Sequence, residues 1–126
     1  MTEKIKTEQY PWPIVGKFNV ERCALLSIDF QVDYWASDGY FADLGLDTSH
    51  LSSILGPVAE VLKTARNKGV QVIHTREGFH PDLSDCPQTK VSRAIERGHP
   101  MGRNGRYGRL LIKGEPGWDI VEAVYP

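Results

Sequence analysis

The stretch CALLSIDFQVDYW, residues 23–35, decides the fold class. Its first six residues form an almost continuous apolar run that ends at Asp29, a pattern typical of a strand buried on both faces of a parallel sheet. A second run of the same kind, VQVIHT at 70–75, follows later in the chain. The two runs predict neighbouring strands of one α/β domain.

The segment between these runs predicts a long amphipathic helix. Its apolar residues recur every three or four positions and so share one face: Leu51, Ile54, Leu55, Val58, Val61, Leu62 and Ala65. Asp47, Thr48 or Ser49 can cap the start, and Gly69 closes the end. Pro57 either belongs to the first turn of the main helix, after a short turn at 50–55, or kinks one longer helix. A strand, a helix and a strand in this order predict a right-handed βαβ unit.

The rest of the chain carries weaker patterns. Residues 1–22 are polar and then proline-rich, which predicts an extended arm on the domain surface. Residues 76–109 predict irregular chain with a short helix at 90–97, and a further helix is expected within 118–125. Two buried strands are too few for a complete parallel sheet, so we expect the fold to need more polypeptide, either a continuation or a partner chain.

Composition restricts the class of protein. The chain has 126 residues, 40% of them hydrophobic, which suits one globular domain. Its formal net charge of -1 gives no general attraction to nucleic acid or to anionic membranes, and no apolar run approaches the roughly 20 residues that span a bilayer. The first residues lack a secretory leader, so we expect a cytoplasmic protein in which Cys23 and Cys86 are free thiols.

One local stretch is basic. Its arginines alternate with Gly102, Gly105 and Gly108, and they are Arg93, Arg97, Arg103, Arg106 and Arg109. Such a stretch can hold a phosphate or an acidic substrate, although a solvated loop is the more frequent meaning. Base-stacking aromatic residues are nearly absent there, so we expect no nucleic-acid partner.

Candidate catalytic residues follow the two predicted strands. In open α/β sheets, ligands bind outside the carboxyl ends of the strands. Asp29 stands at the end of the first strand, where a desolvated carboxylate can accept a proton from a nucleophile; the alternative is that it caps the following turn. The polar segment HTREGFHPD, residues 74–82, follows the second strand and either lines a pocket or forms a turn. His74 within it is more typical of a core residue than of a ligand.

Four motifs in a fixed order resemble a known family. They are YPWP at 10–13, Asp38-Gly39-Tyr40, HTREGFHPDL at 74–83 and GEPGWDIV at 114–121. Together with ALLSIDFQVDYW they resemble the isochorismatase-like cysteine hydrolase superfamily, and within it the biuret hydrolase branch with its relative triuret hydrolase. Four motifs along most of the chain make the resemblance specific.

The resemblance implies a Rossmann-like three-layer α/β/α domain, usually a homo-oligomer, that hydrolyses a C–N bond of a small ureide without metal or cofactor. A cysteine attacks the carbamoyl carbon, an aspartate takes the thiol proton and a lysine stabilises charge. Asp29 matches the family aspartate. Phe30, Gln31, Tyr34 and Glu77 are the expected substrate-binding residues.

The departures from the family pattern are equally specific. The family lysine stands beyond the GEPGWDI motif, whereas Lys113 precedes it, and neither Cys23 nor Cys86 matches the nucleophile. Residues 23–126 therefore resemble the N-terminal half of the domain. A naturally short, non-catalytic homologue that binds a ureide or pairs with a full-length subunit is the alternative. Gly78 stands where nicotinamidase relatives carry an aspartate that holds a metal, so we expect no metal site.

Overall fold

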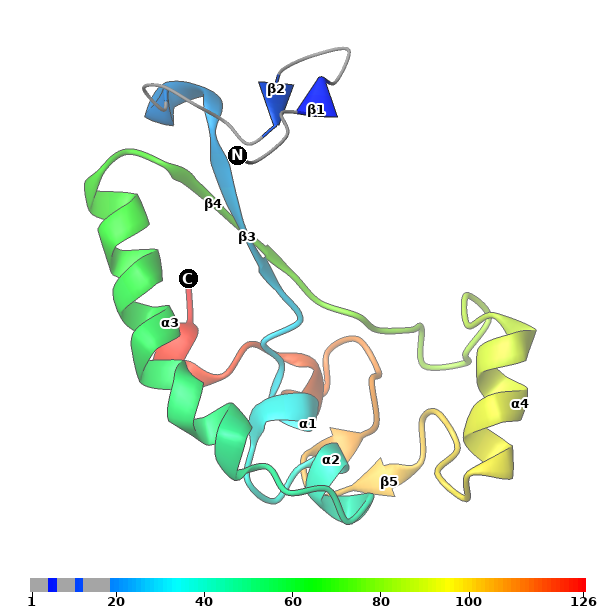
Figure 1. The fold of residues 1–126 in the computed structure, drawn as a ribbon. Coiled ribbons are helices and arrows are strands. Elements are labelled where there is room, and N and C mark those ends of the chain that lie inside the picture. Colours follow the sequence, from blue (N-terminus) through cyan, green and yellow to red (C-terminus); the bar gives the residue numbers. More distant parts are fainter. Residues whose placement is uncertain (1–4, 7–10, 13–18) are drawn as a thin grey trace.

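The computed structural model describes residues 5–6, 11–12 and 19–126 (Figure 1). Near the N-terminus, β1 (Ile5–Lys6) pairs antiparallel with β2 (Pro11–Trp12), and η1 (Val20–Arg22) is a single 3-10 turn. Most of the arm predicted for residues 1–22 lies outside the described residues. None of the helices in the described part is long and apolar enough to cross a membrane.

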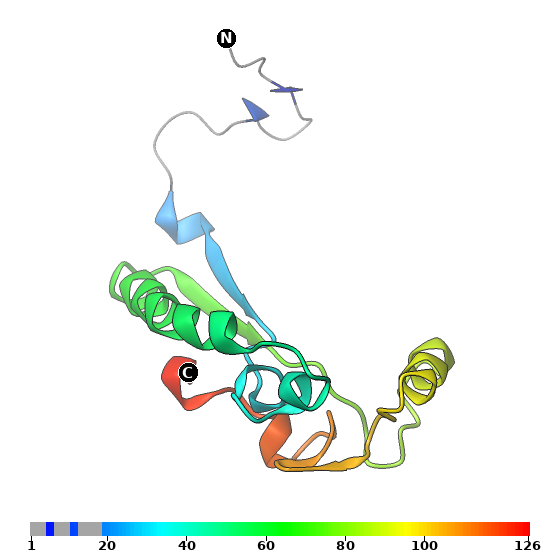
Figure 2. The ribbon, with the colours of Figure 1, turned by 60° about the horizontal axis from the view of Figure 1, so that its bottom comes forward.

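The predicted βαβ unit is present. β3 (Ala24–Ile28) pairs in parallel with β4 (Gln71–Thr75), with a register that runs from Ala24 opposite Gln71 to Ile28 opposite Thr75. The long helix α3 (Ser49–Asn67) connects them and lies along one side of the strand pair in both views (Figures 1 and 2). The α/β class predicted from the two apolar runs is therefore confirmed.

Helix α3 settles the ambiguity at Pro57 in favour of one longer helix that contains the proline. At its start, the carboxylate of Asp47 accepts the backbone N–H of Ser49 at 2.9 Å, which satisfies a donor that the helix itself leaves free. At its end, Gly69 adopts a φ of +74°, and Val70 N–H then bonds the carbonyl of Ala65 at 3.0 Å. The chain turns directly into β4.

The core behind the sheet forms on one face only. Leu25 and Val72 pack against a cluster centred on Leu62 of α3, which is 2% exposed. On the opposite face, Leu26 is 56% and Ile28 is 60% exposed. No element in the described part of the chain covers this second face, so burial of the strands on both faces stays a prediction that requires further polypeptide.

Short elements build the other half of the molecule. They are α1 (Val32–Trp35), α2 (Tyr40–Asp43), α4 (Gln88–Glu96), β5 (Asn104–Gly105) and β6 (Gly108–Arg109). The predicted helix at 90–97 is confirmed as α4. A second apolar cluster, which includes Phe79, Leu111 and Ile112, contacts α1, α2 and α4. Figures 1 and 2 place α3 and α4 at opposite sides of the molecule, with α1 and α2 between them.

The helix predicted within 118–125 is wrong. The chain forms two 3-10 turns there, η2 (Pro116–Trp118) and η3 (Glu122–Val124). Between them the backbone is extended, because Val32 N–H bonds the carbonyl of Asp119 at 2.9 Å and Val121 N–H bonds the carbonyl of Phe30 at 2.9 Å. These bonds to the segment after β3 use the backbone groups that a continuous helix would need.

Candidate active site

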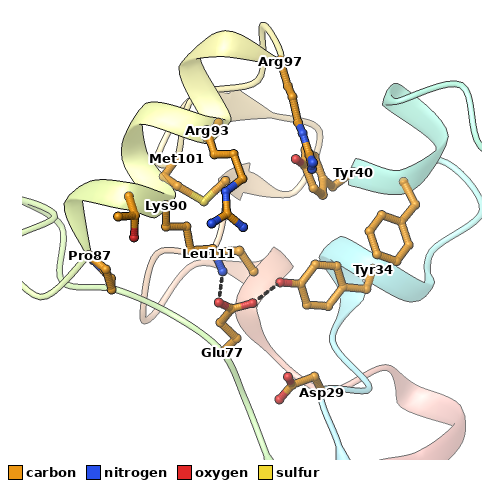
Figure 3. Close-up of a pocket in the computed structure, with 13 residues that line it drawn as sticks. Asp29, Tyr34, Tyr40, Glu77, Pro87, Lys90, Arg93, Arg97, Met101 and Leu111 are labelled. Carbon is orange, nitrogen blue, oxygen red and sulfur yellow. Dashed lines mark hydrogen bonds and ion pairs between the residues drawn. The ribbon is translucent and has the colours of Figure 1, made fainter.

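A pocket of about 500 Å³ opens at the carboxyl ends of β3 and β4 (Figure 3). Asp29 lies at its floor, Tyr34 and Glu77 line its middle, and α4 supplies the opposite wall with Lys90 and Arg93. This is the edge at which open α/β sheets bind ligands. Three of the five predicted site residues, Asp29, Tyr34 and Glu77, therefore meet in one pocket.

Asp29 is held by four backbone and side-chain contacts. Its backbone has a φ of +55°, a left-handed conformation that aspartate tolerates better than most residues. The Asp29 N–H donates to the carbonyl and to the hydroxyl oxygen of Thr75, each at 3.2 Å. The Asp29 carbonyl accepts the indole N–H of Trp35 at 3.0 Å. The Thr75 hydroxyl donates to the Asp29 carboxylate at 2.7 Å. The carboxylate is thus oriented before any ligand binds.

Glu77 is the centre of a polar network in the pocket. The Tyr34 hydroxyl donates to one of its carboxylate oxygens at 2.6 Å, and the Lys90 ammonium donates to the other. Burial, reinforced by the nearby carboxylates of Asp29 and Asp33, raises the pKa of Tyr34, so the phenol stays a donor. Burial lowers the pKa of Lys90, and the charge of Asp29 opposes that shift.

Two of the residues predicted to contact substrate do not line this pocket. Gln31 is fully buried: its amide nitrogen donates to the carbonyls of Glu77 and Trp118 at 2.8 and 2.9 Å, and its oxygen accepts Glu77 N–H at 2.7 Å. Phe30 stacks on Trp35 with ring centroids 4.2 Å apart and packs with the α3 cluster. Neither residue lines the pocket. The structure places both residues in the packing behind this pocket, and their contact with substrate stays a prediction.

The packing around Gly78 explains why no side chain stands there. A Cβ at this position would collide with the indole ring of Trp118, which comes from the GEPGWDIV motif. The aspartate that nicotinamidase relatives carry here would need that space. Within residues 19–126 and the two short strands before them, no group of three or more His, Cys, Asp or Glu side chains gathers in a way that could hold a metal ion.

Neither cysteine lies in the pocket with Asp29. Cys23 stands at the start of β3, the end opposite Asp29, and its thiol contacts the carbonyl of Asn19 at 2.9 Å. Cys86 packs against the second apolar cluster, where burial raises the pKa of its thiol, which disfavours the thiolate. Lys113 is bound to Asp85 at 2.7 Å, on the surface.

Sequence reasoning missed several residues of the pocket. Thr75 ends the second strand, and the parallel register alone suffices to place it beside the end of the first. No sequence pattern predicts the position of Lys90, because its contact with Glu77 depends on how the irregular chain between β4 and α4 folds. Tyr40, Met101 and Leu111 also line the pocket.

Comparison with known proteins identifies the family of this chain. Residues 23–126 match the family model described as the isochorismatase domain. The chain belongs to the isochorismatase family. Its relatives include the ureidoacrylate amidohydrolase RutB of Azorhizobium caulinodans, which is 30% identical over 114 residues, 85% of this chain. The enzyme of the same name from Methylorubrum extorquens is 28% identical over 122 residues, 92% of this chain.

A solved structure shares the fold. A cysteine hydrolase from Pseudomonas syringae pv. phaseolicola superposes with a TM-score of 0.64 at 23% identity and covers 91% of this chain. The match covers 45% of that structure, and those with the two relatives cover 48% and 47% of their lengths. The chain therefore spans about half the length of the proteins it matches.

Proposed function

We propose that this isochorismatase-family chain belongs to an amidohydrolase that cleaves a carbamoyl C–N bond of a small ureide, with Asp29 as the proton acceptor. The observation that carries the proposal is the Asp29 carboxylate, oriented by the Thr75 hydroxyl at 2.7 Å at the floor of a pocket of about 500 Å³. A carboxylate held in this way can accept a proton from a nucleophile without first reorganising.

In the proposed reaction, Asp29 takes the proton of a cysteine thiol, and the thiolate attacks the carbamoyl carbon. The C–N bond breaks, the leaving nitrogen takes the proton from Asp29, and ammonia or an amine departs. Water then hydrolyses the thioester and restores the thiol. Because Cys23 and Cys86 both lie away from Asp29, we propose that the nucleophile and the lysine belong to polypeptide outside this sequence, in a continuation or a partner chain.

The substrate is proposed from two kinds of support. The motifs at 74–83 and 114–121 favour biuret or triuret, and the relatives named above are ureidoacrylate amidohydrolases. All of these compounds present a carbamoyl group. The test is ammonia release from biuret, triuret, ureidoacrylate and an N-carbamoyl amino acid by the protein at its full natural length. Hydrolysis of any of these compounds supports the proposal. If the folded protein releases ammonia from none of them, the proposal is contradicted and the non-catalytic alternative is favoured.

A second experiment tests the source of the nucleophile. The isolated 1–126 chain, its length confirmed by mass spectrometry, should release no ammonia from these ureides. Addition of a chain that supplies the lysine and cysteine should restore turnover. If the isolated chain is active and loses activity on Cys23→Ser or Cys86→Ser, the nucleophile has been assigned wrongly.

We also propose that the active form is a homo-oligomer. The exposed apolar side chains of Leu26, Ile28 and Ile73 on the second face of the strand pair support further burial of this region. Light scattering on the full-length protein measures the mass directly, and a monomer at micromolar concentration would contradict the proposal.

A further inference from the structure

The structure separates the five arginines of the basic stretch into two groups. Three are engaged by the protein itself: Arg103 bonds Asp43 at 2.6 Å, Arg106 pairs with Asp38 at 2.6 Å, and Arg109 donates to the carbonyls of Gly102 and Pro81 at 3.1 and 2.8 Å. These contacts stabilise the loops. They leave Arg93 and Arg97 as the candidates for binding an anion.

Arg93 and Arg97 share one face of the pocket. Arg93 lies within α4 and Arg97 caps its end, four residues later, so both side chains leave the same side of the helix. Both line the pocket and extend from α4 toward it (Figure 3). Among residues 19–126, neither guanidinium makes a side-chain hydrogen bond or an ion pair.

The charges in the pocket are therefore arranged with opposite signs at its two ends. In the middle, Glu77 and Lys90 neutralise each other. Asp29 lies on one side of this pair, and Arg93 and Arg97 lie on the other (Figure 3). An anionic group is repelled at the Asp29 end and attracted at the arginine end. The distribution of charge thus orients a substrate that carries one anion.

The wall between the two ends suits a short carbon chain. Met101 and Leu111 line the pocket together with the arginines and supply apolar surface. A guanidinium presents two parallel N–H donors that match the geometry of a carboxylate. A neutral ureide leaves both guanidinium groups without an anionic partner.

We infer that the preferred substrate is a ureido acid, a ureide that carries a carboxylate, with its carbamoyl group at Asp29 and its carboxylate on Arg93 and Arg97. The inference rests on the proposed function for the carbamoyl end. It goes further by naming the residues that recognise the other end, and it selects anionic ureides over neutral ones such as biuret.

The test uses a pair of ligands that differ only in charge, 3-ureidopropionate and its neutral amide, 3-ureidopropionamide. Binding to the full-length protein is measured by isothermal titration calorimetry in an Asp29→Asn background, which removes the proposed proton acceptor and so prevents turnover. The carboxylate ligand should bind about tenfold more tightly or better, as charge-assisted hydrogen bonds predict. This preference should disappear in Arg93→Gln/Arg97→Gln.

Two further variants separate a specific site from general charge. Arg22→Gln removes the same charge at η1, before the start of β3 and so at the opposite end of that strand from Asp29, and it should keep the preference. Arg93→Lys/Arg97→Lys keeps the charge but loses the paired donors, so an intermediate preference is expected. Circular dichroism checks that each variant is folded. If Arg93→Gln/Arg97→Gln does not fold, Arg93→Lys/Arg97→Lys replaces it in the test.

Equal binding of the two ligands, no binding of 3-ureidopropionate, or a preference that survives in Arg93→Gln/Arg97→Gln overturns the inference. Ammonia release distinguishes this failure from that of the proposed function. Preferential hydrolysis of neutral ureides would support the proposed function and contradict the inferred anion site. Binding of 3-ureidopropionate through Arg93 and Arg97 without hydrolysis of any ureide would support the anion site and contradict the proposed function.

Discussion

The hydroxyl of Thr75 donates a 2.7 Å hydrogen bond to the carboxylate of Asp29, which joins the last residue of one strand to the residue that follows its parallel neighbour. The two residues lie 46 positions apart in the chain. Their meeting depends on the parallel register of β3 and β4, in which Ile28 stands opposite Thr75. The sheet thus orients the proposed proton acceptor directly.

Replacing Asp29 tests the proposed chemistry. Asp29→Asn in the full-length protein should remain folded but lower kcat by about 10²- to 10⁴-fold, because an amide cannot accept the thiol proton. Asp47→Asn makes the same chemical change at the start of α3, where asparagine also caps, and should leave kcat unchanged. Near-normal turnover by a folded Asp29→Asn variant would remove Asp29 from the mechanism.

Replacing Thr75 tests whether orientation of Asp29 matters. Thr75→Val keeps the shape of the side chain but removes the hydroxyl, so we expect kcat/KM to fall about tenfold, as for loss of one hydrogen bond to a charged group. Thr75→Ser retains the donor and should recover most of the activity. If the valine and serine variants are equally active, the hydrogen bond does not contribute to catalysis.

A pair of glycine variants tests the close packing of Gly78 against Trp118. Gly78→Ala should lower the free energy of unfolding by about 1–3 kcal/mol, because the added methyl collides with the Trp118 ring. Gly56→Ala lies inside α3, meets no atom within 4 Å, and should raise stability by up to about 1 kcal/mol. Urea denaturation measures both, and a neutral Gly78→Ala would show that Trp118 is free to move.

Asp33 makes stability depend on pH. Its carboxylate is buried and accepts the N–H of Leu111 at 2.9 Å. Burial raises its pKa above the usual 3.8, and the Leu111 N–H and the charge of Arg103 offset part of this rise. The folded protein therefore binds this proton more tightly than the unfolded chain does. The contribution of Asp33 to the free energy of unfolding is largest below pH 3.8 and falls as pH rises through the folded-state pKa.

The variant Asp33→Asn removes this titration and keeps an oxygen for Leu111. The free energy of unfolding of the original protein minus that of Asp33→Asn should therefore decrease from about pH 3 to about pH 7. Urea denaturation at several pH values measures the difference. A difference that is flat with pH, or that increases, would contradict the raised pKa of Asp33.

Removal of metals tests the absence of a metal-dependent step. Because Trp118 fills the space that an aspartate at position 78 would need, dialysis of the full-length protein against a chelator should leave its ureide hydrolysis unchanged. Added zinc, manganese or iron should have no effect. Activity that is lost on dialysis and restored by one of these ions would overturn the proposed metal-independent mechanism.

The sequence by itself determined the βαβ unit and the place of Asp29. The apolar runs at 23–28 and 70–75 and the helical spacing between them are local patterns, and a strand or a helix follows from local spacing. The same patterns left Pro57 open, because both helix geometries satisfy the spacing. In the structure α3 runs through Pro57, and Leu55 and Val58 on either side of it pack against the same apolar cluster.

Only the tertiary structure decided which polar residues face the pocket. Gln31 and Tyr34 lie three residues apart, yet Gln31 is buried against backbone groups of Glu77 and Trp118, whereas the Tyr34 hydroxyl meets the Glu77 carboxylate in the pocket. Likewise, Arg93 lines the pocket, whereas Arg103 is held by Asp43. These roles depend on partners that lie far away in the sequence. A buried polar group must find a partner wherever the fold brings one, and the local sequence does not record which partner that is.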